Sequence, residues 1–292
     1  DLMSLMVPDV GGTSRGVVFV LLGSKAVAKM QGVAELDALA TVGMFGAVSA
    51  STLAAGMAML DDAGTSYEGY IGALYPFMDI AALVTAIVLA KLSVARQPSN
   101  TVQVNGGGTA TMGGPTSQKQ LSPPEGTAGL VNDILVDTFR SPAISALVAG
   151  LCLGALAKPD TVFDSFYEPL FRGLLSVLML IMGMEAWARF AELRKVAHAY
   201  ILYGISAPII HGLFGFGVGL IAHELTGFSE GGIVLLAVMA ASSSDISGPP
   251  TIRAALPEAN SSAYVGTSTG LGTPIAILSI PLFMALAELL VG

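Results

Sequence analysis

Charged side chains are scarce in this 292-residue sequence, where Asp, Glu, Lys and Arg together make up 12% of the residues. Soluble globular domains carry about 25%. Hydrophobic residues make up 53% and the mean hydropathy is +0.73, so the chain has too few charges to solvate the surface of a globule of its size. The composition therefore predicts a polytopic membrane protein, whose lipid-facing surface needs no charge.

Two further shortages exclude other classes of protein. The single cysteine, Cys152, excludes a secreted scaffold held by disulfides. The net charge is −8 and no basic stripe is present, so we expect no nucleic-acid partner. The three histidines, at 198, 211 and 223, lack metal-ligand spacing, so we expect them to hold no metal.

Long apolar runs recur along the chain, and roughly 20 such residues cross a bilayer. They predict an all-α fold with eight spans, near residues 16–30, 36–60, 69–91, 134–157, 165–188, 198–222, 231–252 and 261–290. The first is the weakest, because Arg15, Lys25 and Lys29 crowd it. A Gly-, Pro- and Ser-rich stretch cannot bury enough apolar area to fold, so residues 98–133 are predicted to be a flexible linker between 1–97 and 134–292.

The basic residues indicate an orientation. With the linker in the cytoplasm and the spans alternating, all but three of the 13 Lys and Arg residues fall on the inner side. The three outer ones are Arg15, Lys158 and Arg172. This asymmetry follows the positive-inside rule and predicts a multi-pass protein of the plasma (inner) membrane. Arg172 and Arg189 each follow a glutamate by four residues, which predicts two ion pairs on a helix surface.

An internal repeat relates the two halves of the chain. Residues 46–52 (GAVSAST) align with 240–246 (AASSSDI) at a constant offset, so that Ser51 matches Asp245. In the predicted topology the two segments run in opposite directions. The repeat is therefore inverted, as it is in many secondary transporters.

Both copies of the repeat carry small polar residues in the middle of a span. Gly248, Pro249 and Pro250 follow the second copy, and the prolines should break that helix. We therefore predict two broken helices that meet at the membrane midplane. Freed N–H groups would suit an anion, and freed carbonyls would suit a cation such as sodium.

Hydroxyl side chains near the repeats are the predicted ligands of an anion. Short donors hold a small oxyanion without a fixed positive charge, although small residues also permit close helix packing. The predicted substrate-binding residues are Ser49, Ser51, Thr52, Ser243 and Ser244.

Asp245 lies between serines in mid-span, where a carboxylate costs roughly 2.5–3.5 kcal/mol and is usually functional. Hard cations prefer oxygen ligands, so a sodium site is predicted there, with a structural aspartate as the alternative. The hydroxyls expected to share in cation binding are those of Ser242, Ser247, Thr267, Thr269 and Thr273. The run GTSTG at 266–270 matches a nucleophile elbow, but that motif needs a preceding strand. We expect no enzyme and no cofactor.

Several segments resemble the sodium-dependent bicarbonate permease family known from cyanobacteria. They are GAVSAST, ALYPFMDIAALVTAIV, FYEPLFRGLLSVLMLIMGMEAWAR, AASSSDISGPPTIRA and GTSTGLGTPIAI. The resemblance implies a ten-span, five-plus-five inverted-repeat fold and a homotrimer in the lipid bilayer. It also implies sodium–bicarbonate symport and inhibition by a cytoplasmic PII-like regulatory protein. It makes Asp79 a second cation ligand.

The sequence departs from the family pattern in three places. Two further spans would precede the one at 16–30, Ala50 stands where the family has Gly, and Ala81 stands where it has Pro. The function expected is sodium-coupled symport of bicarbonate, as part of a carbon-concentrating mechanism. Two alternatives stay open: sodium-coupled transport of another small anion such as a carboxylate, and a non-transporting membrane partner or sensor.

Overall fold

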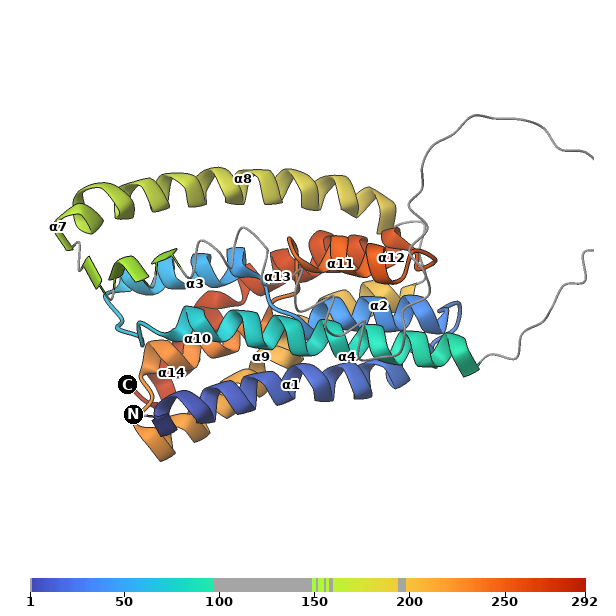
Figure 1. Ribbon diagram of the computed structural model, residues 1–292, viewed down its shortest axis with the longest axis horizontal. Helices are drawn as coiled ribbons and strands as arrows, with labels where there is room; N and C mark the ends of the chain where they lie inside the picture. Colours follow the sequence, from blue (N-terminus) through green and yellow to red (C-terminus); the bar gives the residue numbers. More distant parts are fainter. Residues whose placement is uncertain (1, 97–148, 151, 155, 158–159, 194–197) are drawn as a thin grey trace, which may run out of the picture.

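A computed structural model describes residues 2–96, 149–150, 152–154, 156–157, 160–193 and 198–292 (Figure 1). All regular elements in these ranges are helices, which confirms the predicted all-α class. The predicted linker at 98–133 and most of the predicted span at 134–157 lie outside the described residues.

Five helical stretches of the described chain are long and apolar enough to cross a bilayer: Glu35–Ala63, Ile71–Ser93, Phe163–Phe190, His198–Thr226 and Ser261–Leu290. They correspond to five of the predicted spans. The predicted span at 231–252 is interrupted, and only Glu230–Ala241 forms a shorter apolar helix. The chain is thus a multi-pass membrane protein, while the total of eight spans stays a prediction.

The N-terminal half consists of α1 (Leu2–Ala28), α2 (Glu35–Gly46), α3 (Ala50–Ala63), η1 (Ile71–Leu74) and α4 (Tyr75–Arg96). Glu35 and Asp37 lie in the first turn of α2, where negative charge complements the helix dipole. Helix α3 begins after Ser49, whose side chain accepts the Thr52 amide, and ends at Gly64, whose φ of 70° suits glycine. Helix α1 corresponds to the span predicted near 16–30. It begins at Leu2, well before residue 16, and is not among the five stretches long and apolar enough to cross a bilayer.

The C-terminal half has more interruptions. Its elements are α7 (Asp160–Val162), the π-helix η2 (Phe163–Tyr167), α8 (Glu168–Leu193), α9 (His198–Thr226), α10 (Glu230–Ala241), α11 (Gly248–Ala255), α12 (Ser261–Thr267), the π-helix η3 (Ser268–Gly272), α13 (Thr273–Leu278) and α14 (Ile280–Leu290). Side-chain caps start two of them, Ser229 at α10 and Asn260 at α12. Glu68 accepts the amide and the hydroxyl of Ser229, at 2.6 and 2.8 Å, and so ties the loop before η1 to the start of α10.

Two apolar clusters flank the centre of the bundle. One joins α3, α9, α10 and α14, and includes Leu236 and Phe283. The other joins α1, α2, α4 and α12, and includes Val42 and Tyr264. Glycines allow close approach inside the first cluster: a Cβ on Gly215 of α9 would lie 2.9 Å from the Leu236 carbonyl oxygen of α10. The broken helices contribute to both clusters: α3 and α10 to the first, and α2 and α11 to the second.

Helix α8 runs along one side of the molecule, on the opposite side from α1 (Figure 1). Most of its apolar side chains are exposed, and Leu180 and Trp187 are 66% and 79% exposed. Such a surface suits lipid or a second protein chain rather than water.

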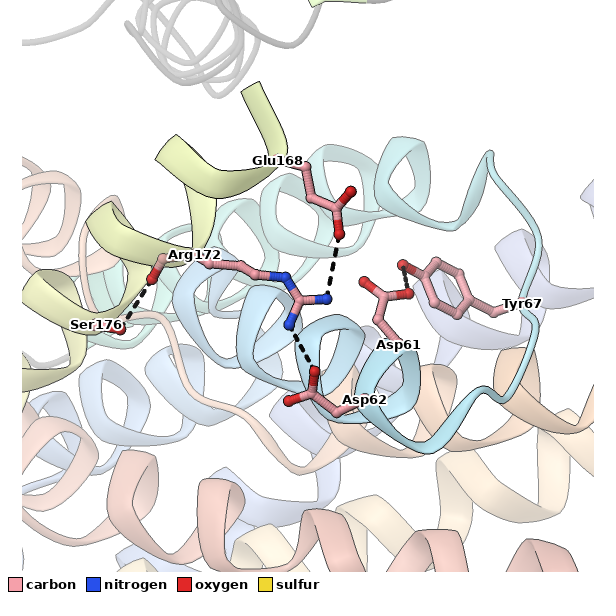
Figure 2. Close-up of polar contacts among 6 residues, drawn as sticks. All are labelled: Asp61, Asp62, Tyr67, Glu168, Arg172 and Ser176. Atoms are coloured by element: carbon pink, nitrogen blue, oxygen red, sulfur yellow. Dashed lines mark hydrogen bonds and ion pairs between the residues drawn. The ribbon is translucent and has the colours of Figure 1, made fainter. Parts of the chain in front are cut away.

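Both predicted ion pairs of α8 are present. Glu168 lies 3.3 Å from Arg172, and Glu185 lies 3.5 Å from Arg189. Arg172 also makes a closer contact of 2.6 Å with Asp62 at the end of α3 (Figure 2). The sequence did not predict this second partner, which ties α8 to the broken helix α2–α3.

Candidate functional site

Two interruptions face each other at the centre of the bundle. Helix α2 ends at Gly46 and α3 begins at Ala50, while α10 ends at Ala241 and α11 begins at Gly248. Helix α3 contacts α10, and α2 contacts α11, so the two broken helices run in opposite directions. The two interrupted helices thus lie against each other, while their position at the membrane midplane stays a prediction.

The second break lies before the prolines rather than at them. The chain leaves the helix at Ser242, whose backbone is extended. Pro249 and Pro250 occupy the first turn of α11. The predicted break at 248–250 was therefore wrong in position, because proline fits the first turn of a helix, where an N–H would have no partner within the helix.

Direct hydrogen bonds join the two breaks. The Ser49 amide donates to Ser242 Oγ at 2.9 Å, and the Ser244 amide donates to the carbonyl of Met44 at 2.9 Å. Ser242 Oγ in turn donates to the Met239 carbonyl at 2.7 Å. The backbone groups that the breaks release are thus satisfied across the junction instead of along one helix.

Asp245 lies in the second break and receives hydroxyls from the first. Its Oδ2 accepts Ser49 Oγ at 2.9 Å and also a short contact from Ser51 Oγ. The two hydroxyls lie 2.8 Å apart. Three oxygen-bearing side chains from two elements therefore converge on one point, which is the kind of ligand set that a hard cation prefers.

Asp79 of α4 binds both breaks. It is buried; its Oδ1 accepts the Val48 amide at 3.1 Å, and its Oδ2 accepts Ser247 Oγ at 2.8 Å. Ser247 Oγ is 2.9 Å from Ser244 Oγ, which accepts the Gly248 amide. A second carboxylate thus lies within a network of hydroxyls and amides.

The remaining hydroxyls are buried beside the crossing. Ser243 Oγ donates to the carbonyl of Ser268 in η3 at 3.2 Å, which links the second break to the last span. Seven side-chain oxygens are buried with no hydrogen-bond partner among the described residues. Two belong to Tyr200 and Tyr203, and the other five belong to Thr52, Thr267, Ser268, Thr269 and Thr273. These five were all candidates from the sequence: Thr52 for the anion, and Thr267, Ser268, Thr269 and Thr273 as residues that could line the cation path. Buried hydroxyls are rarely left unpaired, so an ordered water or a bound ligand would satisfy these five.

Arg15 is more deeply buried than the sequence indicated. Its side chain is 1% exposed, within α1, and its predicted position on the outer side of the membrane stays a prediction. Nη2 donates to the Gly46 carbonyl at 2.9 Å and Nη1 to the Ala240 carbonyl. The guanidinium thus contacts both broken helices at once. The signal for this was the polarity of residues 9–16 (DVGGTSRG), which is unusual inside an apolar helix.

His211 of α9 holds a third released carbonyl. Its Nδ1 lies 3.3 Å from the Phe45 carbonyl oxygen, and because a carbonyl only accepts, Nδ1 carries the proton. The ring stacks on Phe19 at 3.8 Å between centroids. His211 is therefore a packed helix histidine.

The fold and the site define a class: a multi-pass helical membrane protein in which two oppositely directed broken helices enclose carboxylates and free hydroxyls, an arrangement found in ion-coupled transporters. The profile of the Na+-dependent bicarbonate transporter superfamily matches residues 2–288, and the chain belongs to that family. Transport rather than enzymatic chemistry is the activity of the family. No curated protein gives a significant match to this chain.

Proposed function

We propose that the chain couples the entry of bicarbonate to that of sodium, as a symporter for inorganic carbon uptake across the plasma membrane. The family supplies the two solutes. The observation that carries the proposal is the pair of carboxylates, Asp79 and Asp245, each held by hydroxyls from the facing break. A sodium ion would replace those hydroxyl protons as the partner of the carboxylate.

The anion would bind at the amino end of α3. A helix amino end attracts an anion through its free amides, and Ser49, Ser51 and Thr52 lie in this turn. The amino end of α11 is poorer in donors, because Pro249 and Pro250 have no N–H. Ser243 and Ser244 would contribute from the second break.

The cation ligands would be the carboxylates and the hydroxyls around them. Asp245 forms one group, and Asp79 with Ser247 forms another. Ser49 and Ser51, which hydrogen bond to Asp245, stay assigned to the anion. The further hydroxyls assigned to the cation path are Ser242, Thr267, Thr269 and Thr273. The buried, unpaired oxygens of the three threonines support this assignment.

An inverted repeat of five-plus-five spans would account for the way the broken helices α2–α3 and α10–α11 face each other. Ser51 and Asp245 occupy matching positions of the two sequence repeats, and they are hydrogen bonded to each other. Matching residues of two inverted copies meet in this way beside a two-fold axis. The opposite directions of α2–α3 and α10–α11 agree with that symmetry.

A homotrimer and a PII-like cytoplasmic regulator complete the proposal by family resemblance. The exposed apolar face of α8, with Leu174 and Trp187, gives such an assembly a surface to bury. A different small anion, such as a carboxylate, is the second solute that the same hydroxyl cradle would accept.

Uptake of labelled bicarbonate into proteoliposomes tests the proposal. We expect uptake in a sodium gradient and none when choline replaces sodium. Asp245→Asn should lower the apparent sodium affinity at least tenfold, whereas Glu258→Gln, at an exposed loop position, should leave it unchanged. Sodium-independent uptake would refute the coupling. Binding of a regulator with no flux under any condition would favour the sensor alternative.

A further inference from the structure

The guanidinium of Arg15 lies between the carboxyl ends of two broken helices. Gly46 is the last residue of α2, and Ala240 is the penultimate residue of α10. Arg15 donates to the carbonyls of both, although the two residues come from opposite halves of the chain. The side chain reaches this position from α1, a third element, and is 1% exposed.

The two carbonyls are available because the helices stop. In an unbroken helix the amide of Ser244 would bind the Ala240 carbonyl. Here that amide donates to Met44, and the Val48 amide that would have bound Met44 donates to Asp79. The Met44 carbonyl thus receives the Ser244 amide in place of the Val48 amide, and the Ala240 carbonyl is left without a backbone donor. The guanidinium of Arg15 supplies that donor.

The place where Arg15 lies attracts positive charge. A helix carboxyl end carries roughly half a negative charge, and two such ends converge on the guanidinium. None of the ion pairs found in the described residues involves Arg15. Its recorded hydrogen-bond partners are the two carbonyls alone, so its charge is balanced by helix ends rather than by a carboxylate.

Tyr203 and His211 of α9 lie near Arg15, and His211 is held by the Phe45 carbonyl. Released carbonyls at half-helix carboxyl ends are the ligands with which transporters coordinate sodium. In this chain a side chain of the protein has taken them.

We propose that Arg15 is a built-in cation, which occupies the position between the carboxyl ends of α2 and α10 that a sodium ion would otherwise fill. The inference rests on the proposed sodium-coupled transport. It assigns the coupling sodium to the carboxylates, Asp79 and Asp245, and excludes it from the carbonyls of Gly46 and Ala240. It further implies that removing the guanidinium creates an additional sodium site.

The test compares the sodium dependence of thermal stability in the full-length protein and in Arg15→Met. Sodium chloride is titrated against choline chloride at constant ionic strength. Met fills the space without charge or donors, so the two carbonyls become free to bind an ion. We expect Arg15→Met to be less stable than the wild type in choline, and to regain stability in sodium through a rise in Tm beyond that of the wild type.

A purely structural role for Arg15 predicts a different result. The variant would then lose the same stability in sodium and in choline, and this outcome would overturn the proposal. If Arg15→Met cannot be purified in either salt, the neutral variant Arg15→Leu decides. It also leaves the two carbonyls without a cation, so we expect the same extra sodium response, and a response equal to that of the wild type would overturn the proposal. Arg15→Lys retains a positive charge and should respond to sodium as the wild type does.

Potassium chloride provides the control for ion specificity, since a site sized for sodium should respond less to the larger ion. The readout is also independent of transport. Sodium-independent uptake by the wild type would refute the proposed function, whereas an unaltered sodium response of the neutral Arg15 variants would refute this inference alone.

Discussion

The amide of Ser244 donates to the carbonyl of Met44 at 2.9 Å, which joins the two broken helices backbone to backbone. Neither residue has a charged side chain, and 200 positions separate them in the sequence. This bond fixes how the breaks face each other, and it places Ser49 and Ser51 beside Asp245. The site is therefore held first by main-chain geometry and only then by the side chains that would contact ions.

Thr52 and Thr41 lie on the same broken helix and should respond oppositely to replacement by valine. Thr52 Oγ1 is buried with no partner, whereas Thr41 Oγ1 donates to the Asp37 carbonyl at 2.7 Å. An unsatisfied buried polar group costs about 1–3 kcal/mol, and a satisfied hydrogen bond contributes about 1 kcal/mol. We expect Thr52→Val to raise the Tm of the ligand-free protein and to weaken bicarbonate uptake.

Thr41→Val is the matched control, and it should lower Tm slightly without changing the apparent affinity for bicarbonate or sodium. Differential scanning fluorimetry in detergent and uptake assays in proteoliposomes measure the two effects. A Thr52→Val protein with normal uptake would remove that hydroxyl from the substrate site.

Gly215 and Gly217, both on α9, separate packing from helix propensity. A Cβ on Gly215 would meet Ala240 Cβ and lie 2.9 Å from the Leu236 carbonyl oxygen, while a Cβ on Gly217 meets nothing within 4 Å. Overpacking costs about 1–3 kcal/mol. We expect Gly215→Ala to lower Tm by several degrees and Gly217→Ala to maintain or raise it, because alanine is favoured in helices by about 1 kcal/mol. Equal Tm values for the two variants would show that α9 and α10 are not in close contact.

The contact between Asp62 and Arg172 predicts rescue by charge exchange (Figure 2). Both side chains are largely exposed, so the attraction is weak and screened by salt. Asp62→Arg should lower Tm by placing like charges together, and the double variant Asp62→Arg/Arg172→Asp should restore it. Choline chloride at high concentration should reduce the difference. If the double variant is no more stable than the single one, the two side chains do not pair in the membrane.

Loss of the hydrogen bond from Tyr67 to Asp61 should make the folded protein less stable at alkaline pH. Tyr67 lies outside the five spans, donates its hydroxyl to Asp61 at 3.0 Å, and has its pKa raised from 10.0 to about 12, first by burial and then by Asp61. Below pH 10 the tyrosine is protonated in both the folded and the unfolded chain. Its contribution is then complete, and it is lost as the pH rises from about 10 to about 12. Tyr67→Phe should therefore flatten the fall of Tm with pH in that window, as measured by thermal melts at stepped pH.

The sequence was informative where composition alone decides the structure. Uninterrupted apolar runs predicted the helices, and serines beside a lone acid in such a run predicted the region around Asp245. The depth of Arg15 could not be predicted in this way, because a basic residue in a weakly apolar helix has the pattern of a helix end. Only the carbonyls contributed by Gly46 and Ala240 make its burial tolerable, and those belong to elements 31 and 225 positions away.

The prolines show the same limit at short range. A proline pair in an apolar run indicates that a helix is interrupted nearby, but it does not say on which side. Here the chain has already left the helix at Ser242, six residues before α11 begins. Local chemistry thus located the interruption only approximately.

Pro249 and Pro250 also give the two broken helices unequal numbers of backbone N–H groups at the turns that follow the breaks. A pair of perfectly symmetrical breaks would present two amide-rich turns and could seat two anions of equal standing. Because imino acids open α11, only the turn that begins α3 retains its full set of amides. We therefore expect the turn that begins α3 to give a bound anion more backbone donors than the turn that begins α11.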